Sequence, residues 1–512
     1  MSPLDKPNVT IPLAMSYNTR GFAAAAANAM TNAIDQRKIN CVYEPIANQA
    51  TGKKTLYLAK RPGLSKLSSD FGLSASDKAW LVTDFKLPST GPFVWIFFTN
   101  GTTQSASNGS SHPTIVTASL QPIYVTKTSL SGLGYVVVQY VNSSGVQRVF
   151  FAAMSDITTW TEITDSDFSA STAVGMMAHR DGFAHILGTD NKIRSSDLNS
   201  LSAWSATSFI SRAVVEDQAC GLIQHDRITL AFGAETVEGF QNAGNTTGSP
   251  LSRNGITARI GLGGPHVSSG AGYATGTRHY SAALGSRTYF IGAEAGRDYE
   301  ASLYAFNGQT FENVSTPAIR KILSAGPTAG TEPYHVSAFS FYGQDAIGIA
   351  LDVPTATTQR WLVFNPSWNE WFEWQSTEVQ PVCSGGYFIG AHNGNGPRKL
   401  HRFQNDGTEK WVDGASTAYT MTAQFKLPKG DNARQRMPWC GVVGDSASSA
   451  SSVVGVSFSD DDYPTFSTAR DIDMSQRKKH IYRCGSYRDR AVRLTHSHAS
   501  ACRLEKFIAR IE

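Results

Sequence analysis

The chain has 512 residues, of which 17% are charged and 45 are glycine, and its formal net charge is +4. This length exceeds what one compact core usually holds, so we expect several units or one ring of repeats. Few charges and many glycines favour short strands and turns over long amphipathic helices. Because phosphate contacts supply most of the affinity for nucleic acid, a charge so close to neutral argues against tight DNA binding.

The N-terminal region differs in texture from the rest of the chain. Within residues 1–35, the stretch 21–35 has helical propensity and predicts either one short helix or an arm that a partner orders. The alanine-rich run 22–27 is too short for a signal core or a membrane span, so we expect a soluble protein without membrane insertion. The six cysteines contain no Cys-x-x-Cys pair, which predicts buried free thiols in a protein made in a reducing cytoplasm.

Strand-like sequence begins near Ile39. Residues 40–45 and 54–63 alternate apolar and polar side chains, and the second stretch ends at Arg61-Pro62-Gly63, a motif that stops a strand. Residues 93–98 and 135–140 are apolar runs that predict fully buried strands.

A pattern of strand, polar turn and tryptophan-bearing strand recurs along the chain. It occurs in residues 150–160, 192–204 and 361–371, and more weakly in 303–311 and 399–411. Trp160 and Trp204 are 44 residues apart, and Trp371 and Trp411 are 40 apart. A hairpin that recurs every 40–50 residues is typical of β-propeller blades. Because one four-stranded blade cannot bury both faces alone, we expect these tryptophans to fill the space against a neighbouring blade.

The middle of the chain offers a hairpin and a glycine-rich segment. Residues 228–240 predict two strands joined at Gly233-Ala234-Glu235, with Glu238 on the second strand. Residues 261–272 contain many glycines, but no Lys-Ser/Thr follows them and no helix is predicted after them. We therefore expect no nucleotide site and no cofactor.

The sequence changes again beyond residue 410. A strand at 453–459 runs into the acidic turn Asp460-Asp461-Asp462, which either holds Ca²⁺ or, as we prefer, is a solvated structural turn. His496 and His498 could form half of a metal site, although an ordinary solvated strand is the favoured interpretation. Arginines at 483, 488 and 490 make this region locally basic and, with the three aspartates, could meet DNA or an acidic protein ring, although interface ion pairs or a solvated sheet face are the favoured interpretation.

Together these patterns predict an all-β protein. We expect a β-propeller of six or seven blades, with a small additional β domain formed by the C-terminal segment and, as a further option, the N-terminal one. The predicted divisions are an N-terminal arm and first strand pair at 1–65, a propeller body at 66–415 and a C-terminal β domain at 416–512.

Carbohydrate chemistry is the alternative function for such a scaffold. A glycosidase needs two carboxylates across the scissile bond, or a tyrosine nucleophile with arginines in the sialidase case. The acids Asp217, Glu235, Glu238 and Glu294 are available, but their spacing does not establish that they converge. A sialidase-like or receptor-binding propeller therefore remains the second hypothesis. Under the preferred hypothesis we expect a protein that is not an enzyme.

Several segments, in order, resemble the tail nozzle proteins of short-tailed bacteriophages, also called packaged-DNA stabilisation proteins. The resemblance is carried by Arg20, 36–40, Tyr43-Glu44 and 60–63, then by 226–244, 289–292, 304–308 and 314–319, and finally by 457–462, Arg483, Gly485 and 488–490. The chain departs from the family pattern in residues 22–33 and in the absence of a glycine after Asp462.

This resemblance implies a structural protein of the virion tail, assembled in the host cytoplasm. Such proteins form a six-fold ring below the portal and its adaptor, and their propeller-like body surrounds a channel that retains and then releases double-stranded DNA. Tailspikes or fibres dock around the ring, and a needle or plug can close it. The resemblance implies no catalytic residue, metal or cofactor.

Overall fold

The computed structural model describes residues 9–13, 37–47, 54–71, 73, 77–86, 92–100, 102–142, 146–169, 173–245, 247–262, 280–295, 300–325, 335–351, 357–391, 399–403, 411–414, 416–427, 434–461 and 463–512. The chain forms two compact units. Unit 1 comprises Met1–Lys66, Leu362–Glu378 and Phe403–Glu512, and unit 2 comprises Leu67–Trp361 and Val379–Arg402. Residues 362–378 and 403–414, assigned above to the propeller body, are thus grouped with unit 1. The alanine-rich run, Asp462 and the predicted boundary at 415 lie outside the described residues.

Unit 2 is a series of antiparallel sheets that follow one another along the chain, as a propeller requires. The first four sheets have four strands each: β6 (Lys78–Lys86), β7 (Pro92–Asn100), β8 (Thr103–Ser107) and β9 (Thr114–Thr117); β10 (Leu120–Leu130), β11 (Leu133–Asn142), β12 (Gln147–Ala153) and β13 (Asp156–Glu162); β14 (Ala173–Arg180), β15 (Phe183–Gly188), β16 (Lys192–Ser196) and β17 (Trp204–Ser211); β18 (Ala219–His225), β19 (Ile228–Gly233), β20 (Val237–Asn242) and β21 (Leu251–Ala258). A short helix, α2 (Ser166–Ser169), lies between the second and third sheets in sequence.

The later sheets of unit 2 vary this plan. The fifth sheet contains β22 (Ile260–Gly261), β23 (Ser281–Leu284), β24 (Arg287–Glu294), β25 (Ala301–Phe306) and β26 (Phe311–Asn313). Helix α3 (Pro317–Ser324) then leads to the hairpin β27 (Val336–Phe341) and β28 (Gln344–Ala350) and to β29 (Gln359–Asn365), within which the two units divide. The last sheet contains β31 (Val379–Ser384), β32 (Tyr387–Gly390), β33 (Lys399–Phe403) and β5 (Leu64–Asp70).

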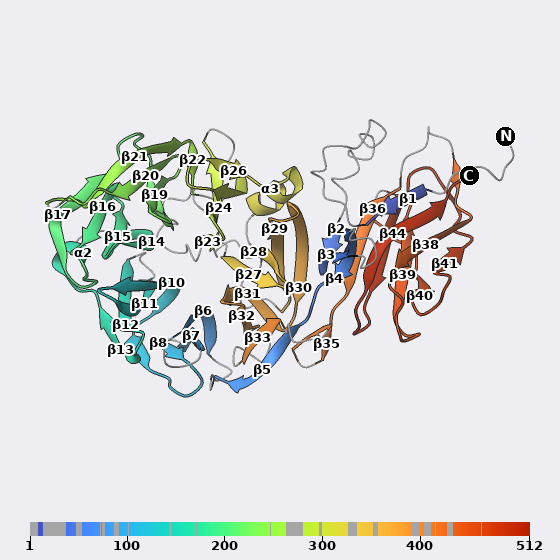
Figure 1. Ribbon diagram of the computed structural model, residues 1–512, viewed down its shortest axis with the longest axis horizontal. Helices are drawn as coiled ribbons and strands as arrows, with labels where there is room; N and C mark the ends of the chain where they lie inside the picture. Colours follow the sequence, from blue (N-terminus) through green and yellow to red (C-terminus); the bar gives the residue numbers. More distant parts are fainter. Residues whose placement is uncertain are drawn as a thin grey trace. The chain divides into compact units, whose positions relative to one another are not determined.

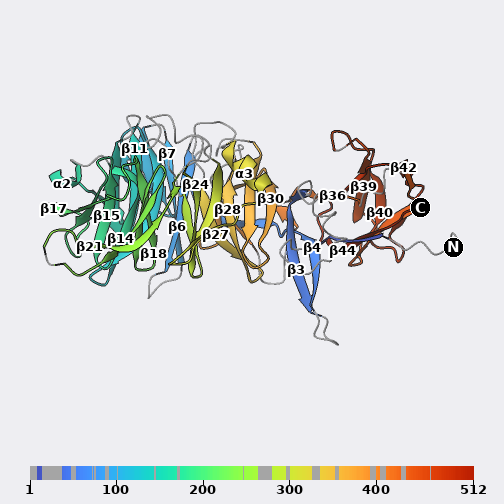
Figure 2. The ribbon, with the colours of Figure 1, turned by 90° about the horizontal axis from the view of Figure 1, so that it is seen from above.

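The sheets of unit 2 are arranged around a common centre (Figure 1). The labels of β6, β10, β14, β23, β27 and β31 lie nearest that centre, and those of β13, β17 and β21 lie at the rim. Figure 2 shows the strands of this unit standing side by side. The all-β, propeller-like fold expected from the sequence is therefore present.

The apolar cores of unit 2 lie between neighbouring sheets. One cluster joins Phe97 of the first sheet to Tyr140 of the second. Others join the second sheet to the third, the third to the fourth and the fourth to the fifth. A further cluster joins Val82 and Phe98 of the first sheet to Ile389 of the last. Each sheet therefore removes apolar surface from water by packing against the next one, which is the main stabilising term available to it.

One hairpin turn recurs in six successive sheets. Two residues join the first two long strands in each: Ser131-Gly132, Asp181-Gly182, Asp226-Arg227, Gly285-Ser286, Tyr342-Gly343 and Gly385-Gly386. The first residue of every pair has a positive φ, between 45° and 59°. Two-residue loops of this kind match the right-handed twist of the strands they join. Successive turns are separated by 43 residues (342 to 385) to 59 residues (226 to 285), so the turn is the repeating element of this unit.

Unit 1 is built from N-terminal and C-terminal strands together. This is the arrangement in which the N-terminal segment also contributes to the additional β domain. One sheet contains β1 (Val9–Pro12), β3 (Cys41–Ala47), β4 (Lys54–Lys60), β44 (Arg503–Arg510), β38 (Trp439–Gly444) and β41 (His480–Tyr482). The other contains β30 (Glu370–Ser376), β2 (Arg37–Ile39), β36 (Met421–Lys426), β43 (Ala491–His496), β39 (Val453–Ser459) and β40 (Arg470–Asp473). Two small ladders pair β34 (Val412–Asp413) with β35 (Thr417–Ala418) and β37 (Gln435–Arg436) with β42 (Ser486–Tyr487).

Aromatic side chains from the two main sheets of unit 1 pack against each other. The rings of Phe425 and Phe507 are 5.3 Å apart, and those of Tyr43 and Phe372 are 5.2 Å apart, both with edge-to-face geometry. Such pairs stabilise a sandwich beyond the area they bury. Within the part of the chain that the structure describes, no helix is long and apolar enough to cross a membrane.

The recurrent two-residue turns, called inner turns below, allow a matched pair of substitutions. A Cβ on Gly132 (φ +78°) would meet open space, whereas one on Gly182 (φ +83°) would lie 2.8 Å from Oδ1 of Asn199. That oxygen accepts a hydrogen bond from the Ser131 amide in the preceding sheet, at 3.2 Å. We expect Gly132→Ala to lower the free energy of unfolding by about 1 kcal/mol, through backbone strain alone. Gly182→Ala should cost about 2 kcal/mol, because it also disturbs the contact with Asn199.

Urea denaturation of the full chain and of both variants measures this difference. Equal shifts of the two midpoints would show that the Asn199 bridge between the two turns contributes nothing to stability.

Candidate functional site

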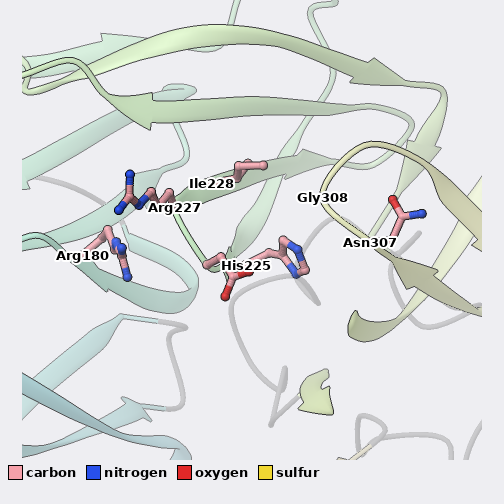
Figure 3. Close-up of a pocket in the computed structure, with 7 residues that line it drawn as sticks. Arg180, His225, Arg227, Ile228, Asn307 and Gly308 are labelled. Carbon is pink, nitrogen blue, oxygen red and sulfur yellow. The ribbon is translucent and has the colours of Figure 1, made fainter. Parts of the chain in front are cut away.

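A basic pocket of about 430 Å³ lies on unit 2 (Figure 3). Three hairpin turns from three sheets form it: those of β14–β15, β18–β19 and β25–β26. In Figure 3 the Arg180 and Arg227 side chains lie on one side of His225, and Asn307 lies on the other. The pocket is lined by Arg180, His225, Asp226, Arg227, Ile228, Asn307 and Gly308.

Local sequence explains how these side chains are positioned. Asp226 adopts the positive φ of the recurrent inner turn, which places His225 and Arg227 at its two ends. Asn307 begins the opposite turn, where its Oδ1 accepts hydrogen bonds from the amides of Gln309 (3.0 Å) and Thr310 (2.8 Å). An Asn side chain that bonds to its own turn in this way stabilises the turn locally.

His225 is the most constrained side chain of the pocket. Nδ1 lies 2.9 Å from Oγ1 of Thr288, and the ring meets Phe306 edge to face at 4.9 Å. Gly308 allows the close approach of the neighbouring turn, since a Cβ there would lie 3.4 Å from Nε2. Burial lowers the pKa of His225, while Asp226 opposes that effect.

The pocket has the chemistry of an anion-binding site. Two guanidinium groups can donate paired hydrogen bonds to a carboxylate or a phosphate. Arg180 is already 3.0 Å from the carboxylate of Asp181, and Asp226 also faces the pocket, so its net positive charge is modest. Arg227 is exposed on its turn.

The hairpin predicted at 228–240 forms β19 and β20, and its carboxylates are tied to the backbone. The Glu238 side chain is buried and accepts hydrogen bonds from the amides of Ala213 and Val214, both at 3.0 Å. Asp217 accepts from the amides of Glu235 (2.8 Å) and Thr236 (2.9 Å). These acids brace the fourth sheet.

Gly233 and Arg212 complete this brace. A Cβ on Gly233 would lie 2.2 Å from the Asp217 carboxylate, so only glycine fits there. Arg212, whose side chain is fully buried, donates to Asp217 at 2.7 Å and to the Asn191 side chain at 2.8 Å. Glu235 is exposed at the turn, and Glu294 ends β24 in the next sheet.

Arg61 occupies the centre of a buried polar cluster in unit 1. Its guanidinium donates to both oxygens of Asp413, to Oδ1 of Asn40 at 3.0 Å and to the carbonyl of Gln375 at 3.0 Å. The guanidinium also stacks on the ring of Tyr419, 3.9 Å from its centroid. Arg61 and Asp413 are both about 1% exposed. Four separate stretches of chain therefore meet at this one side chain.

The rest of the Lys60–Gly63 motif supports this arrangement. Pro62 and Gly63 lie between β4 and β5 and are buried, and the Pro62 carbonyl accepts a hydrogen bond from Arg61 at 3.0 Å. Lys60 donates to the His498 carbonyl at 2.7 Å and lies over the Tyr419 ring. Burial, with Arg61 beside it, lowers the pKa of Lys60 to about 8. The motif predicted to end a strand therefore also supplies Arg61, the buried charge of this polar cluster in unit 1.

The tryptophans of the sequence repeat have different environments. Trp160 on β13 meets Phe97 of the preceding sheet edge to face at 5.8 Å. Trp204 belongs to the cluster between the second and third sheets and lies 5.1 Å from Phe168. Trp371 contacts Phe364 in unit 1, at 5.0 Å. Trp411 is half-buried and directly precedes β34.

The predicted C-terminal interface combines internal and exposed groups. Arg490 is buried and forms a two-pronged ion pair with Asp460, at 2.6 and 2.7 Å. Asp461 accepts a hydrogen bond from Ser459 at 2.7 Å. Arg483 and Arg488 are exposed, and Asp462 lies outside the described residues. The exposed guanidinium groups of this region are therefore candidates for contact with a partner.

A second cavity, of about 350 Å³, lies in unit 1 beside a chain of serine and histidine side chains. His498 lies 3.0 Å from Ser451 and 2.9 Å from Ser500, and His496 lies 3.0 Å from Ser452. Among the described residues, no group of three or more His, Cys, Asp or Glu side chains is placed to hold a metal ion. The two histidines are thus engaged with serines.

Sequence reasoning missed several residues that organise these sites. Asp413 carries no local signal, because its partner Arg61 is 352 residues away. Arg212 was not singled out, and Asp217 was named only as a candidate catalytic acid; both bond to a turn that follows them by about twenty residues. Arg180 and Arg227 could have been found, since each adjoins a two-residue turn whose first residue is Asp.

No family model and no curated protein matches the chain. Among solved structures, a chain of the mitotic checkpoint complex is 12% identical, with a TM-score of 0.33, and the match covers 60% of this chain and 87% of that one. The computationally designed Ika8 protein is 12% identical, with a TM-score of 0.33 and coverage of 72% and 100%. The Aleuria aurantia lectin in complex with Fucα1-6GlcNAc is 11% identical, with a TM-score of 0.32 and coverage of 60% and 96%. At these scores, none of the likenesses bears on function.

The Arg61–Asp413 pair predicts a large effect for a nearly isosteric change. Asp413→Asn leaves the buried guanidinium without its counter-charge, and we expect it to lower the free energy of unfolding by about 3–5 kcal/mol. The matched control is Glu373→Gln, which neutralises the carboxylate paired with the half-exposed Arg37 in the same unit. That change should cost less than about 1 kcal/mol. Urea denaturation checks both, and similar costs would contradict a central role for Arg61.

Buried histidine predicts that acid weakens unit 2. His185 on β15 is about 1% exposed, its Nδ1 lies 2.9 Å from Ser195, and burial lowers its pKa to about 4. In the unfolded chain the His185 side chain binds a proton near pH 6.5, whereas in the folded chain it does so only near pH 4. The contribution of this residue to stability is therefore fully present above pH 6.5 and falls as the pH decreases toward 4. At pH 5 the loss should be about 1–2 kcal/mol for this one residue.

Denaturation of the parent chain and of His185→Gln at pH 7.5 and pH 5 tests this expectation. The variant should show a smaller difference between the two pH values, whereas His112→Gln, at an exposed position, should behave like the parent. An unchanged difference in His185→Gln would refute the assignment.

Proposed function

We propose that this chain is a structural subunit of the tail of a short-tailed bacteriophage. Six copies would form a ring below the portal and its adaptor, retain the packaged DNA and later form the channel through which the genome leaves. The proposal rests on the ordered resemblance to tail nozzle proteins, which extends over several segments between residues 16 and 494.

One structural observation supports a mechanical role most directly. Three charged side chains in the segments that carry the resemblance serve as internal braces: Arg61, Glu238 and Arg490 are buried, and each is bonded within its own unit. Buried and fully partnered charges hold separate stretches of chain in one arrangement. Side chains used in this way stiffen a scaffold.

The physical demands of a genome conduit agree with the composition and packing. Closely packed sheets deform little under load, which suits a wall that must contain packaged DNA. A conduit must not hold its cargo, and each phosphate contact adds affinity that slows sliding. The net charge of +4 over 512 residues is compatible with this requirement.

The proposed ring needs head-to-tail contacts between identical subunits, which close only if the rotation between neighbours divides a full turn. We assign the exposed Arg483 and Arg488 to a protein contact of the assembled tail, because arginine forms specific paired hydrogen bonds with carboxylates. Tailspikes or fibres, and a needle or plug, are further proposed partners of the assembled ring.

Assembly is the test of this proposal. Mixed with a purified portal–adaptor complex of a short-tailed phage, the chain should add six copies of its 55.3 kDa mass, about 330 kDa in total, measured by mass photometry and seen as a ring in negative stain. The double charge reversal Arg483→Glu, Arg488→Glu should weaken this addition at least tenfold, whereas Arg227→Glu, at an exposed arginine of unit 2, should not.

The competing hypothesis predicts different results. A carbohydrate-active propeller would stay small in mass photometry and would release labelled oligosaccharide from host polysaccharide. Oligosaccharide release without any adaptor-dependent growth in mass would overturn the nozzle proposal.

A further inference from the structure

Two cysteine thiols of unit 1 touch each other. Cys440 lies on β38, and Cys484 lies two residues after β41, the strand that pairs with β38 at the edge of its sheet. Their sulfur atoms are 3.6 Å apart, within hydrogen-bonding distance for thiols. Both cysteines are buried, and both are free thiols in this structure.

The backbone holds the two sulfurs in this position. The Cys484 amide donates to the Met437 carbonyl at 3.1 Å, and the Met437 amide donates to the Gly485 carbonyl at 2.8 Å. Arg483 and Gly485 have positive φ values of 59° and 81°, which turn the chain so that the side chain between them points back toward β38. A disulfide bond of about 2.05 Å needs the sulfurs to approach by roughly 1.6 Å more, a movement that side-chain rotation can supply.

The surroundings make Cys484 the reactive partner. The Arg490 guanidinium donates to the Cys484 carbonyl, and Arg470 donates to the carbonyls of Tyr482 and Arg483. The hydrogen bond from Cys440, with Arg470 and Arg490 nearby, lowers the pKa of the Cys484 thiol to about 7, while the same bond and burial raise the pKa of Cys440. A thiolate beside positive charge is the form that attacks oxidants.

Other thiols of the chain lack this arrangement. Cys41 donates to the carbonyls of Ile39 and Thr422, and Cys220 donates to that of Gln218. Burial raises the pKa of both well above the ordinary value, which keeps them protonated. Cys440 and Cys484 are thus a pair in which sulfur–sulfur contact and a lowered thiol pKa occur together.

We propose that Cys440 and Cys484 are a redox-sensitive pair that a peroxide converts into an intrachain disulfide. The Cys484 thiolate attacks one peroxide oxygen, the O–O bond breaks, and hydroxide leaves, which gives a sulfenic acid. The Cys440 thiol then attacks the Cys484 sulfur, and its proton leaves with the sulfenic oxygen as water. The hydroxide released earlier takes up the proton that Cys484 lost when it ionised, which gives the second water. Two thiols and one hydrogen peroxide thus become one disulfide and two waters.

The bond would fasten the edge of a sheet. Its sheet order ends at β38 and β41, and β41 has only three residues, His480–Tyr482. The disulfide ties the turn after this strand to β38 and so holds the exposed Arg483 in place. The chain would assemble with free thiols in a reducing cytoplasm and become more rigid once outside the cell; this biological role rests on the proposed function, whereas the thiol chemistry does not.

The test starts from the full chain, purified in reductant and then exposed to graded hydrogen peroxide without it. We expect the parent chain to lose two hydrogen atoms in intact mass and to yield one peptide pair linked through Cys440 and Cys484 after proteolysis. Its melting temperature should rise by roughly 5 °C or more, because the crosslink restricts the unfolded chain, and dithiothreitol should reverse both changes.

Variants separate the two roles. Cys440→Ser should accumulate a sulfenic acid at Cys484 that dimedone traps, Cys484→Ser should resist oxidation at Cys440, and Cys220→Ser should behave like the parent chain. Loss of thiols without the Cys440–Cys484 peptide, or with a mixture of linkages, would overturn the proposal. If a variant fails to fold, the peptide map of the parent chain still decides. Because this readout does not involve assembly, its failure leaves the nozzle proposal to its own test.

Discussion

The constraint on which unit 2 depends is that a four-stranded sheet has two faces and can bury them only against other sheets. Each core cluster described for this unit joins two neighbouring sheets, and one of them joins the last sheet to the first. The outer strand of the last sheet, β5, comes from the chain before the first sheet, so main-chain pairing supports the same junction. Stability is therefore shared among the sheets, and no single sheet would be stable alone.

Unit 1 relies on a different interaction. Its chain segments are distant in sequence, and the buried Arg61 guanidinium satisfies acceptors from four of them: Asn40, its own neighbour Pro62, Gln375 and Asp413. A buried charge is stable only if its donors are all used, so these segments must adopt one arrangement together. Arg490 in unit 1 repeats this arrangement on a smaller scale, because it bonds to Asp460 and to the Cys484 carbonyl. In each case arginine suits the position, because its planar fork can satisfy several acceptors at once.

The propeller-like architecture could be predicted because its signal is local and repeated. The tryptophan-bearing hairpins led to the right fold, although Trp160 and Trp204 lie between sheets of unit 2 whereas Trp371 lies in unit 1. The two-residue inner turn repeats more regularly than the tryptophan-bearing hairpin. It is formed by residue pairs as different as Asp181-Gly182 and Tyr342-Gly343, which share a backbone conformation. This repeat is therefore difficult to recognise in the amino-acid sequence, because several residue types tolerate a positive φ when the flanking strands impose it.

The sequence by itself determined the all-β class, the repeated sheets, a second β unit that contains the C-terminal segment and the end of β4 at Arg61-Pro62-Gly63. These features follow from strand periodicity and turn chemistry, which act over a few residues. Only the tertiary structure decided that Asp413 neutralises Arg61, that three turns bring Arg180, His225 and Asn307 around one pocket, and that Cys440 meets Cys484. Those contacts join residues 44 to 352 positions apart. Because a side chain carries no record of which distant partner the packed sheets will place beside it, such pairs emerge only when the chain is folded.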